Sequence, residues 1–155
     1  MPLLQEAIQK LKKSDLKTTE RRLSMLELMY KENRYLSAKE VKDSLEEFYP
    51  NISPDTIYRN LHSFSRLEIL EESELDGEKV FRSNCGVEKH HHHFICTNCG
   101  FSKELTSCPL FLYEDELGEV EVTSHRFELL GLCKECLKLK ENKWDSKLDL
   151  LGVNK

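Results

Sequence analysis

The chain has 155 residues and a mass of 18.2 kDa, which suits one mid-sized domain or two small ones and excludes large enzyme folds such as an α/β barrel. Apolar residues make up 39% and charged residues 33%, which argues against a collagen-like or wholly disordered chain. The net charge of −5 is uneven, because residues 1–67 carry 12 Lys and Arg against 10 Asp and Glu, whereas residues 68–155 carry 11 against 18. All six cysteines and five of the six histidines also follow residue 67. We therefore expect a weakly basic part suited to nucleic acid and an acidic part rich in metal ligands.

The expected compartment follows from what the sequence lacks. It starts without a charged-then-apolar leader, and no apolar run approaches the roughly 20 residues that span a bilayer. We expect a cytoplasmic protein with no membrane partner. Thiols stay reduced in that compartment, which favours metal binding over disulfides.

Apolar residues recur at helical spacing in four segments of the first part: Leu4–Leu11, Leu23–Met29, Ala38–Phe48 and Ile57–Phe64. Ser37 to Glu40 has the order of a capping box, and Ser53-Pro54 is a helix start. Two β-prone runs, Ile69–Leu75 and Lys79–Arg82, flank Asp76-Gly77, which predicts a hairpin. Helices followed by a hairpin predict an α+β fold with an N-terminal winged helix-turn-helix domain, whose second helix enters the major groove.

The last of these helices carries a polar stripe opposite its apolar face: Asp55, Tyr58, Arg59, His62 and Arg66. We expect Tyr58 and Arg59 to read bases, because Arg donates two hydrogen bonds to guanine and Tyr offers an apolar face to the thymine methyl. The alternative is an ordinary helical hairpin with a polar outer face. The predicted β-hairpin beside the helix favours DNA binding.

Two C-x-x-C pairs stand in the second part: Cys96 with Cys99, and Cys133 with Cys136. Four thiolates suit tetrahedral zinc, and a closed site of this kind stabilises the structure between its two pairs. A redox pair beside two unrelated cysteines is the alternative, but the strand-then-helix context of such a pair is missing.

A run of four histidines, His90 to His93, precedes the first pair. Side chains alternate between faces along a strand, so His91 and His93 are expected on one face and His90 and His92 on the other. Cys85 precedes this strand, and His125 lies on a later β-prone run, Val120–Leu130. Cys85 with two imidazoles favours Zn²⁺. The alternative is a surface histidine run that binds metals loosely. We expect Cys108 to be a small buried apolar residue rather than a ligand.

Together these motifs resemble the ferric uptake regulator family of bacteria, from Leu4 to about Cys136. Thr56–Leu61 looks like the recognition-helix signature, and His90–Gly100 looks like the metal core. Gly77–Lys79, Cys85 and Ser107–Pro109 are similar to the zinc uptake regulator branch. The resemblance implies a homodimeric, zinc-responsive repressor that binds operator DNA and controls zinc uptake genes. Its expected parts are a winged-helix DNA-binding domain over 1–84, a small α/β dimerisation domain over 85–137 with a four-cysteine zinc site, and a C-terminal extension over 138–155.

The resemblance also implies roles for individual residues. Structural zinc takes the four cysteines of the C-x-x-C pairs. Sensing zinc takes Cys85, His91 and His93, with Glu68 as the expected fourth ligand and Asp76 and Glu78 as competitors. A further site takes His90, His92 and His125. Its usual acidic position matches Phe111, which cannot bind metal, so we expect this site to be weak, absent or completed by Glu104. The expected DNA contacts are Thr56, Tyr58, Arg59, Lys17 and Arg22.

Three other classes of protein were weighed. An iron or peroxide sensor of the same fold prefers oxygen and nitrogen ligands where Cys85 stands. In an interaction module held together by zinc (a zinc-stapled interaction module), the face that carries Tyr58 and Arg59 does not bind DNA. A zinc hydrolase or deaminase needs H-E-x-x-H, or H-x-E with P-C-x-x-C, and neither motif is present, so no enzyme is expected.

Overall fold

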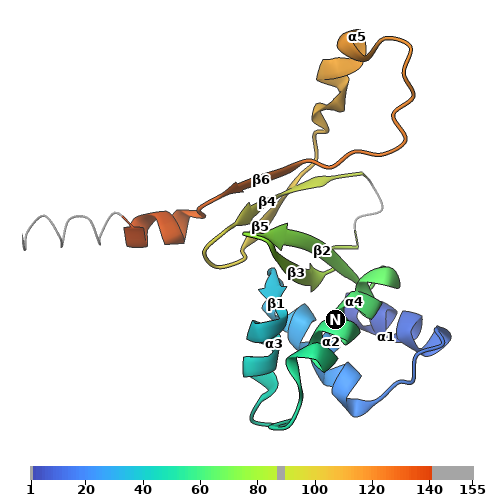
Figure 1. Ribbon diagram of the computed structural model, residues 1–155, viewed down its shortest axis with the longest axis vertical. Helices are drawn as coiled ribbons and strands as arrows, with labels where there is room; N and C mark the ends of the chain where they lie inside the picture. The colour runs from blue at the N-terminus through green and yellow to red at the C-terminus, as the bar shows by residue number, and fades with distance from the viewer. Residues whose placement is uncertain (1, 87–89, 141–155) are drawn as a thin grey trace, which may run out of the picture. The chain divides into compact units, whose positions relative to one another are not determined.

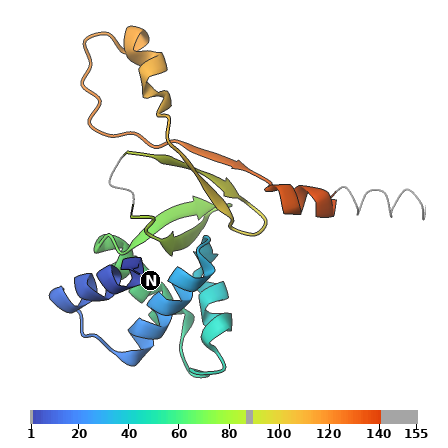
Figure 2. The same ribbon diagram turned by 180° about the vertical axis from the view of Figure 1, so that it is seen from behind.

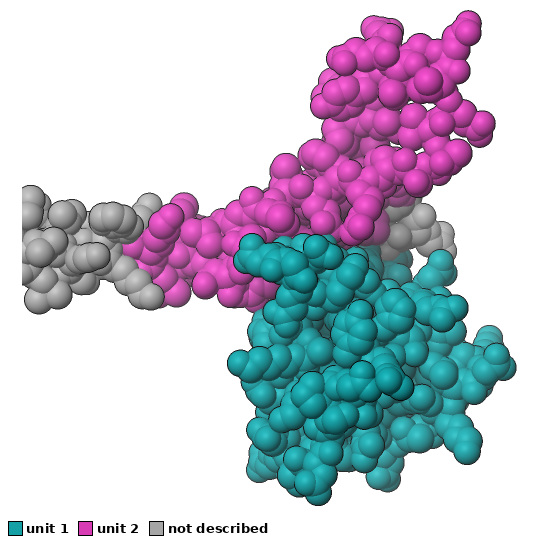
Figure 3. Space-filling model, in the orientation of Figure 1, with its two compact units in different colours: residues 1–89 teal, residues 90–155 magenta. Residues whose placement is uncertain are grey.

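The computed structural model describes residues 2–86 and 90–140. The chain divides into two compact units, a first unit over residues 1–89 and a second over 90–155 (Figure 3). This division falls five residues after the predicted domain boundary, and it keeps Cys85 with the first unit. Of the predicted extension, residues 141–155 lie outside the described residues. Across the described ranges, no helix is both long and apolar enough to cross a membrane.

The first unit consists of helices followed by a three-stranded antiparallel sheet in the order β1-β3-β2 (Figure 1). Its elements are α1 (Pro2–Lys13), α2 (Glu20–Glu32), β1 (Leu36–Ser37), α3 (Ala38–Leu45), α4 (Pro54–Arg66), β2 (Leu70–Leu75) and β3 (Glu78–Ser83). The predicted helices and hairpin strands are confirmed in kind and order. The two-residue strand β1 was not predicted, because so short a strand leaves no periodic pattern.

The helix starts follow the local signals in the sequence. Ser37 Oγ accepts a hydrogen bond from the backbone N–H of Glu40 at 3.2 Å, and the Glu40 carboxylate accepts one from the Ser37 N–H at 2.9 Å. At α4, Ser53 Oγ accepts from the Thr56 N–H at 3.1 Å and Pro54 takes the first helical position. The capping box and the proline start are therefore both confirmed.

The hairpin turn is formed by Asp76 and Gly77, whose φ angles of 50° and 80° both lie in the left-handed region. Two successive residues of this kind match the right-handed twist of the flanking strands. Helix α4 is held against the sheet by a core that includes Phe64 and Phe81, both fully buried. Each such side chain contributes about 1.5–3 kcal/mol by burial, so the orientation of α4 is firmly fixed.

The second unit contains a sheet of order β5-β4-β6, formed by β4 (His92–Cys96), β5 (Ser102–Leu105) and β6 (Glu128–Gly131). Strand β4 pairs antiparallel with β5 and parallel with β6. The long connection to β6 carries η1 (Pro109–Tyr113) and α5 (Glu114–Leu117), as both views show (Figures 1 and 2), and residues 134–140 are helical.

Two strand predictions in this unit need correction. The histidine run lies only partly on β4, which begins at His92. The predicted strand Val120–Leu130 is wrong over its first part, because β6 starts at Glu128 and His125 lies in the irregular connection before it. A β-prone composition did not suffice there, since a strand also needs a paired neighbour.

Candidate metal centres and nucleic-acid interface

The two C-x-x-C pairs come together within the second unit. Cys96 and Cys99 lie at the end of β4 and in the turn after it, and Cys133 and Cys136 follow β6. The four sulfur atoms lie within 4.8 Å of one another, and Cys99 Sγ is 3.8 Å from Cys133 Sγ. Tetrahedral zinc with bonds of about 2.3 Å places its sulfur ligands about 3.8 Å apart. The donor set therefore fits a closed zinc site.

Backbone groups prepare Cys96 for this role. The N–H of Cys133 donates to Cys96 Sγ at 3.3 Å, and the Gly100 N–H closes the turn by donating to the Cys96 carbonyl at 2.9 Å. Burial alone raises the pKa of the Cys96 thiol, but N–H groups of Cys133, Cys99 and Asn98 outweigh it and lower the pKa to about 6. The lowered pKa favours the thiolate, which is the form that binds metal.

A second cluster of donors also lies wholly within the second unit: His90, His92, His125 and Cys108, whose ligand atoms lie within 4.8 Å of one another. His125 Nε2 is 2.9 Å from His90 Nε2, 3.3 Å from His92 Nε2 and 3.2 Å from Cys108 Sγ. Atoms bound tetrahedrally to one zinc ion lie about 3.3–3.6 Å apart when the Zn–N and Zn–S bonds are about 2.0 and 2.3 Å. Three imidazoles and a thiol thus converge at a spacing that fits a single ion.

Cys108, rather than the predicted Glu104, stands in this cluster. Glu104 lies on β5 directly opposite His93 of β4, so it shares the face of His93 and not that of His92. Cys108 instead precedes η1, where its Sγ accepts a hydrogen bond from the Leu110 N–H at 3.5 Å. The expectation that Cys108 is simply apolar is therefore corrected. Its signal in the sequence was weak: one cysteine left unassigned in a segment rich in metal ligands.

The predicted sensing ligands are divided between the units, with Cys85 in the first unit and His91 and His93 in the second. In the first unit, Glu71 Oε1 accepts hydrogen bonds from the backbone N–H and the thiol of Cys85, both at 3.4 Å. In the second unit, the rings of His91 and His93 meet edge to face with centroids 4.9 Å apart. The alternation of the histidine run places this pair apart from the pair His90 and His92, whose centroids are 4.6 Å apart.

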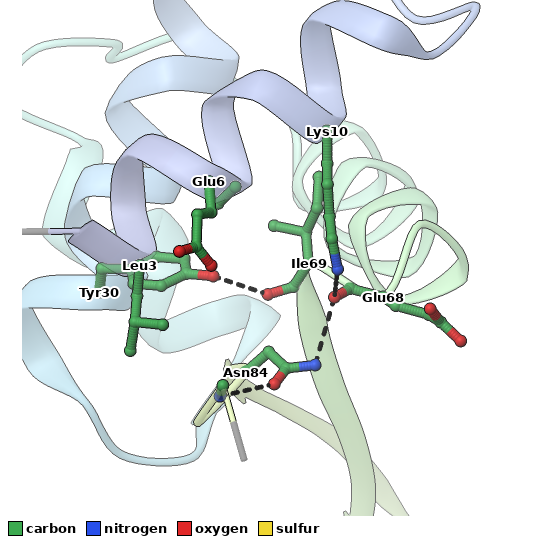
Figure 4. Close-up of a pocket in the computed structure, with 9 residues that line it drawn as sticks. Leu3, Glu6, Lys10, Tyr30, Glu68, Ile69 and Asn84 are labelled. Atoms are coloured by element: carbon green, nitrogen blue, oxygen red, sulfur yellow. Dashed lines mark hydrogen bonds between the residues drawn. The ribbon is translucent and has the colours of Figure 1, made fainter. Parts of the chain in front are cut away.

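The carboxylate beside Cys85 is that of Glu71, not that of the predicted Glu68. Glu68 lies between α4 and β2 with φ of 55°, and its backbone carbonyl accepts hydrogen bonds from Lys10 Nζ at 3.1 Å and Asn84 Nδ2 at 3.2 Å. Figure 4 shows its carboxylate pointing away from these groups. Glu71 lies on β2 opposite Arg82, near the end of β3 from which the chain runs to Cys85. The competitors Asp76 and Glu78 lie at the opposite, turn end of the hairpin.

The exposed stripe of α4 carries the predicted base readers. Arg59 is held by an ion pair from its Nε to Asp55 Oδ2 at 2.9 Å, and its side chain remains 78% exposed. The Tyr58 ring stacks on His62 at 6.1 Å and meets Phe81 edge-on at 6.1 Å. Both predicted readers are therefore exposed on one helix and oriented by neighbouring side chains.

The other predicted DNA contacts, Lys17, Arg22 and Thr56, line one open hollow between the α1–α2 connection and α4. Arg22 donates from Nε to Asn60 Oδ1 at 2.8 Å and from Nη1 to the Lys17 carbonyl at 2.6 Å. The Thr56 hydroxyl lies 2.8 Å from Ser53 Oγ at the start of α4. Arg22 therefore ties the connection to α4, while the Lys17 side chain is exposed.

A carboxylate of the hairpin links it to α4. Glu72 on β2 lies 3.1 Å from His62 Nδ1 and 3.0 Å from Lys79 Nζ on β3. Burial raises the pKa of the Glu72 carboxyl, but hydrogen bonds and charge from Lys79 and His62 outweigh burial and lower the pKa below its ordinary value. Glu72 is therefore ionised. Sequence reasoning did not anticipate this link, because it depends on the register of the hairpin.

Comparison with known proteins identifies the class of protein to which these features belong. A model of the Ferric uptake regulator family matches residues 13–130. The Ferric uptake regulation protein of Staphylococcus epidermidis (strain ATCC 12228) is 46% identical over 131 residues, which cover 84% of this chain and 94% of that protein. The solved ferric uptake regulator of Vibrio cholerae is 31% identical with a TM-score of 0.59, covering 81% of this chain and 98% of that chain. That of Helicobacter pylori, at 23% identity, shares the fold with a TM-score of 0.63 over 88% of this chain and 92% of that chain.

The fold and the matches define a transcription regulator rather than an enzyme. The chain belongs to the Ferric uptake regulator family. Regulators of this family bind metal ions and bind operator DNA as dimers.

Proposed function

We propose that this protein is a zinc-responsive repressor, which binds operator DNA as a homodimer and controls zinc uptake genes. The single observation that carries the choice of metal is the contact of the Cys85 thiol with Glu71 Oε1 at 3.4 Å. A thiolate beside a carboxylate, completed by imidazoles, is a borderline-soft donor set that suits zinc.

DNA binding is supported by the order of elements in the first unit. Helices α3 and α4 are joined by a short connection and followed by the β2–β3 hairpin, the arrangement of a winged helix-turn-helix. In this proposal α4 is the recognition helix. The terminal nitrogens of Arg59 read guanine, the Tyr58 ring contacts a thymine methyl, and Lys17 binds a phosphate. Arg22 and Thr56 support these contacts from the hollow and the helix start.

Homodimerisation is supported by apolar side chains that the second unit leaves exposed. They include Phe111 and Leu112, each 62% exposed, and Leu130, 54% exposed. Large apolar side chains that a small domain leaves exposed favour an interaction site. A second copy of the chain is the partner we propose, in keeping with the dimers of the family.

The proposed sensing ion takes Glu71 and Cys85 before the connection and His91 and His93 after it. Only residues 86–90 separate Cys85 from His91, so one ion can take ligands from both segments. Such an ion restrains the connection that follows the DNA-binding part, and the ordered connection lowers the entropic cost of matching two half-sites. Structural zinc takes the four cysteines, and the cluster of His90, His92, Cys108 and His125 is the further site.

An iron-responsive regulator is the second candidate. The observation that favours it is the name of the relative from S. epidermidis, which is a ferric uptake regulation protein at 46% identity. The two candidates differ in the metal that raises DNA affinity, since both use the same fold and the same helix α4.

A metal titration of DNA binding separates them. A duplex is first selected from a randomised library with Zn²⁺-loaded protein and, separately, with Fe²⁺-loaded protein under anaerobic conditions. Fluorescence anisotropy then measures Kd at buffered free Zn²⁺, Fe²⁺ and Mn²⁺ for the parent, for Cys85→Ser and for the matched control Glu68→Gln.

We expect Zn²⁺ to tighten binding by at least tenfold in the parent and in Glu68→Gln, and to have little effect on Cys85→Ser. Activation by Fe²⁺ but not by Zn²⁺ supports the second candidate. No binding to any selected duplex contradicts both candidates and favours a zinc-stapled interaction module.

A further inference from the structure

His62 lies on the exposed stripe of α4, one turn after Tyr58, and the proposed function gives it no role. Its Nδ1 is 3.1 Å from Glu72 Oε2 on β2, and its side chain is 48% exposed. One ring nitrogen therefore faces the hairpin, while half of the side chain remains open to solvent on the helix that carries Tyr58 and Arg59.

The contact with Glu72 determines what the other ring nitrogen can do. An ionised carboxylate only accepts hydrogen bonds, so Nδ1 of His62 carries the proton that is donated to it. In the neutral ring Nε2 is then an acceptor, which cannot bind a phosphate oxygen. Protonation turns Nε2 into a charged donor, and histidine is the side chain type that most readily takes up a proton near neutral pH.

The surrounding charges make that proton favourable when DNA is present. Glu72 and Glu74 on β2 lie 3.0 and 3.8 Å from the ammonium of Lys79 on β3, and Arg66 follows His62 by four residues on α4. On α4 itself, Tyr58 stacks on the His62 ring, and Arg59 is paired with Asp55. A phosphate that approaches this edge of α4 meets the carboxylates of Glu72 and Glu74 beside the Lys79 ammonium. A second positive charge at His62 offsets the repulsion.

We propose that His62 is a further DNA-binding residue, which takes up a proton when the operator binds and donates from Nε2 to a backbone phosphate beside the β2–β3 hairpin. This inference rests on the proposed function of α4 as the recognition helix. In it, Glu72 is a positioning residue: it fixes the tautomer and orientation of the ring.

His62 can affect DNA binding in two ways, by taking up a proton and by stacking on Tyr58. The variants separate these two contributions. His62→Gln retains an amide that can donate to Glu72 but cannot take up a proton. His62→Phe retains a flat ring for Tyr58 and loses both nitrogens. Glu74→Gln is the matched control, because it changes a carboxylate on the same strand whose ion pair is with Lys79 and not with His62.

The test measures Kd by anisotropy between pH 6 and pH 8 at several salt concentrations, with zinc-loaded protein and the duplex that the parent enriches from a randomised library. One added proton tightens binding by up to about tenfold per pH unit. One added phosphate contact steepens the dependence of log K on log salt by about 0.9. The histidines of the metal clusters are the same in every protein compared, so differences between variants isolate His62.

We expect the parent and Glu74→Gln to gain affinity at pH 6 relative to both His62 variants, by several-fold, with a salt slope steeper by about 0.9. At pH 8 this difference should shrink. Parallel pH profiles and salt slopes for the parent and His62→Gln overturn the inference, even when all affinities fall together, because a merely structural role produces that result. If the parent enriches no duplex at all, the proposed function fails first and this inference fails with it.

Discussion

Replacing Cys96 by serine tests whether the second unit depends on metal for its fold. In the described part of that unit, the buried apolar side chains are Ile95, Cys96 and Cys136, and two of these are proposed zinc ligands. Burial of Ile95 contributes about 1.5–3 kcal/mol. A structural zinc site contributes on the order of 10 kcal/mol. Metal binding therefore outweighs apolar burial within one copy of this unit.

We expect Cys96→Ser to lose the structural zinc and, with it, the sheet of the second unit. The first unit should remain folded, because it has a core of its own that includes Leu11, Met25, Leu61 and Phe81, each fully buried. Hydrogen exchange resolves the two responses: amides of β4, β5 and β6 should exchange rapidly, and amides of α4 and β3 should keep their protection.

Bound zinc per protomer and molar mass by light scattering complete the assay. The matched control is Cys108→Ser, which changes a cysteine of the other cluster and should retain the four-cysteine zinc and the protected sheet. The reasoning is refuted if Cys96→Ser keeps the zinc content, the dimer mass and the exchange protection of the parent.

Three further predictions concern single side chains. Arg59→Ala should lose about 1–3 kcal/mol of discrimination at one operator position. Lys17→Ala should weaken binding to all duplexes and reduce the salt slope by about 0.9. Equal losses of affinity for selected and random DNA in Arg59→Ala would contradict its role as a base reader. Cys108→Ala should weaken metal binding at the histidine cluster as measured by competition with a chromophoric chelator, and Glu104→Ala should leave it unchanged; the reverse order restores the original prediction. Ser53→Ala should lower the free energy of unfolding of the first unit by about 1 kcal/mol in urea, because it removes the cap at the start of α4, and an unchanged midpoint would exclude that contribution.

The features that could be predicted from the sequence are those signalled by residues close together in the chain. Ser37 and Glu40 signal a helix start within four positions, and Asp76-Gly77 signals a hairpin within two. Each signal acts through the backbone that carries it, so no knowledge of the rest of the fold was needed.

The fourth members of the two histidine-containing clusters, Glu71 and Cys108, could not be predicted from such local signals. Glu71 comes beside Cys85 through the register of β2 on β3, and a shift of a few residues separates it from the predicted Glu68. Cys108 reaches His125 because the long connection between β5 and β6 extends away from the sheet and returns to it (Figure 1). Both contacts join residues 14 or 17 positions apart in the chain, and periodicity along the chain does not encode such contacts.

The parallel pairing of β4 with β6 has a consequence for how the protein is made. The strands are joined by a long connection, and Cys133 follows Cys99 by 34 residues. A ribosome that adds about 5–20 residues per second synthesises the first C-x-x-C pair roughly 2–7 s before the second. During that interval the nascent chain holds only half of the proposed coordination shell. The proposed four-cysteine zinc site can therefore form only after nearly the whole chain has been synthesised, and the second unit matures after the first.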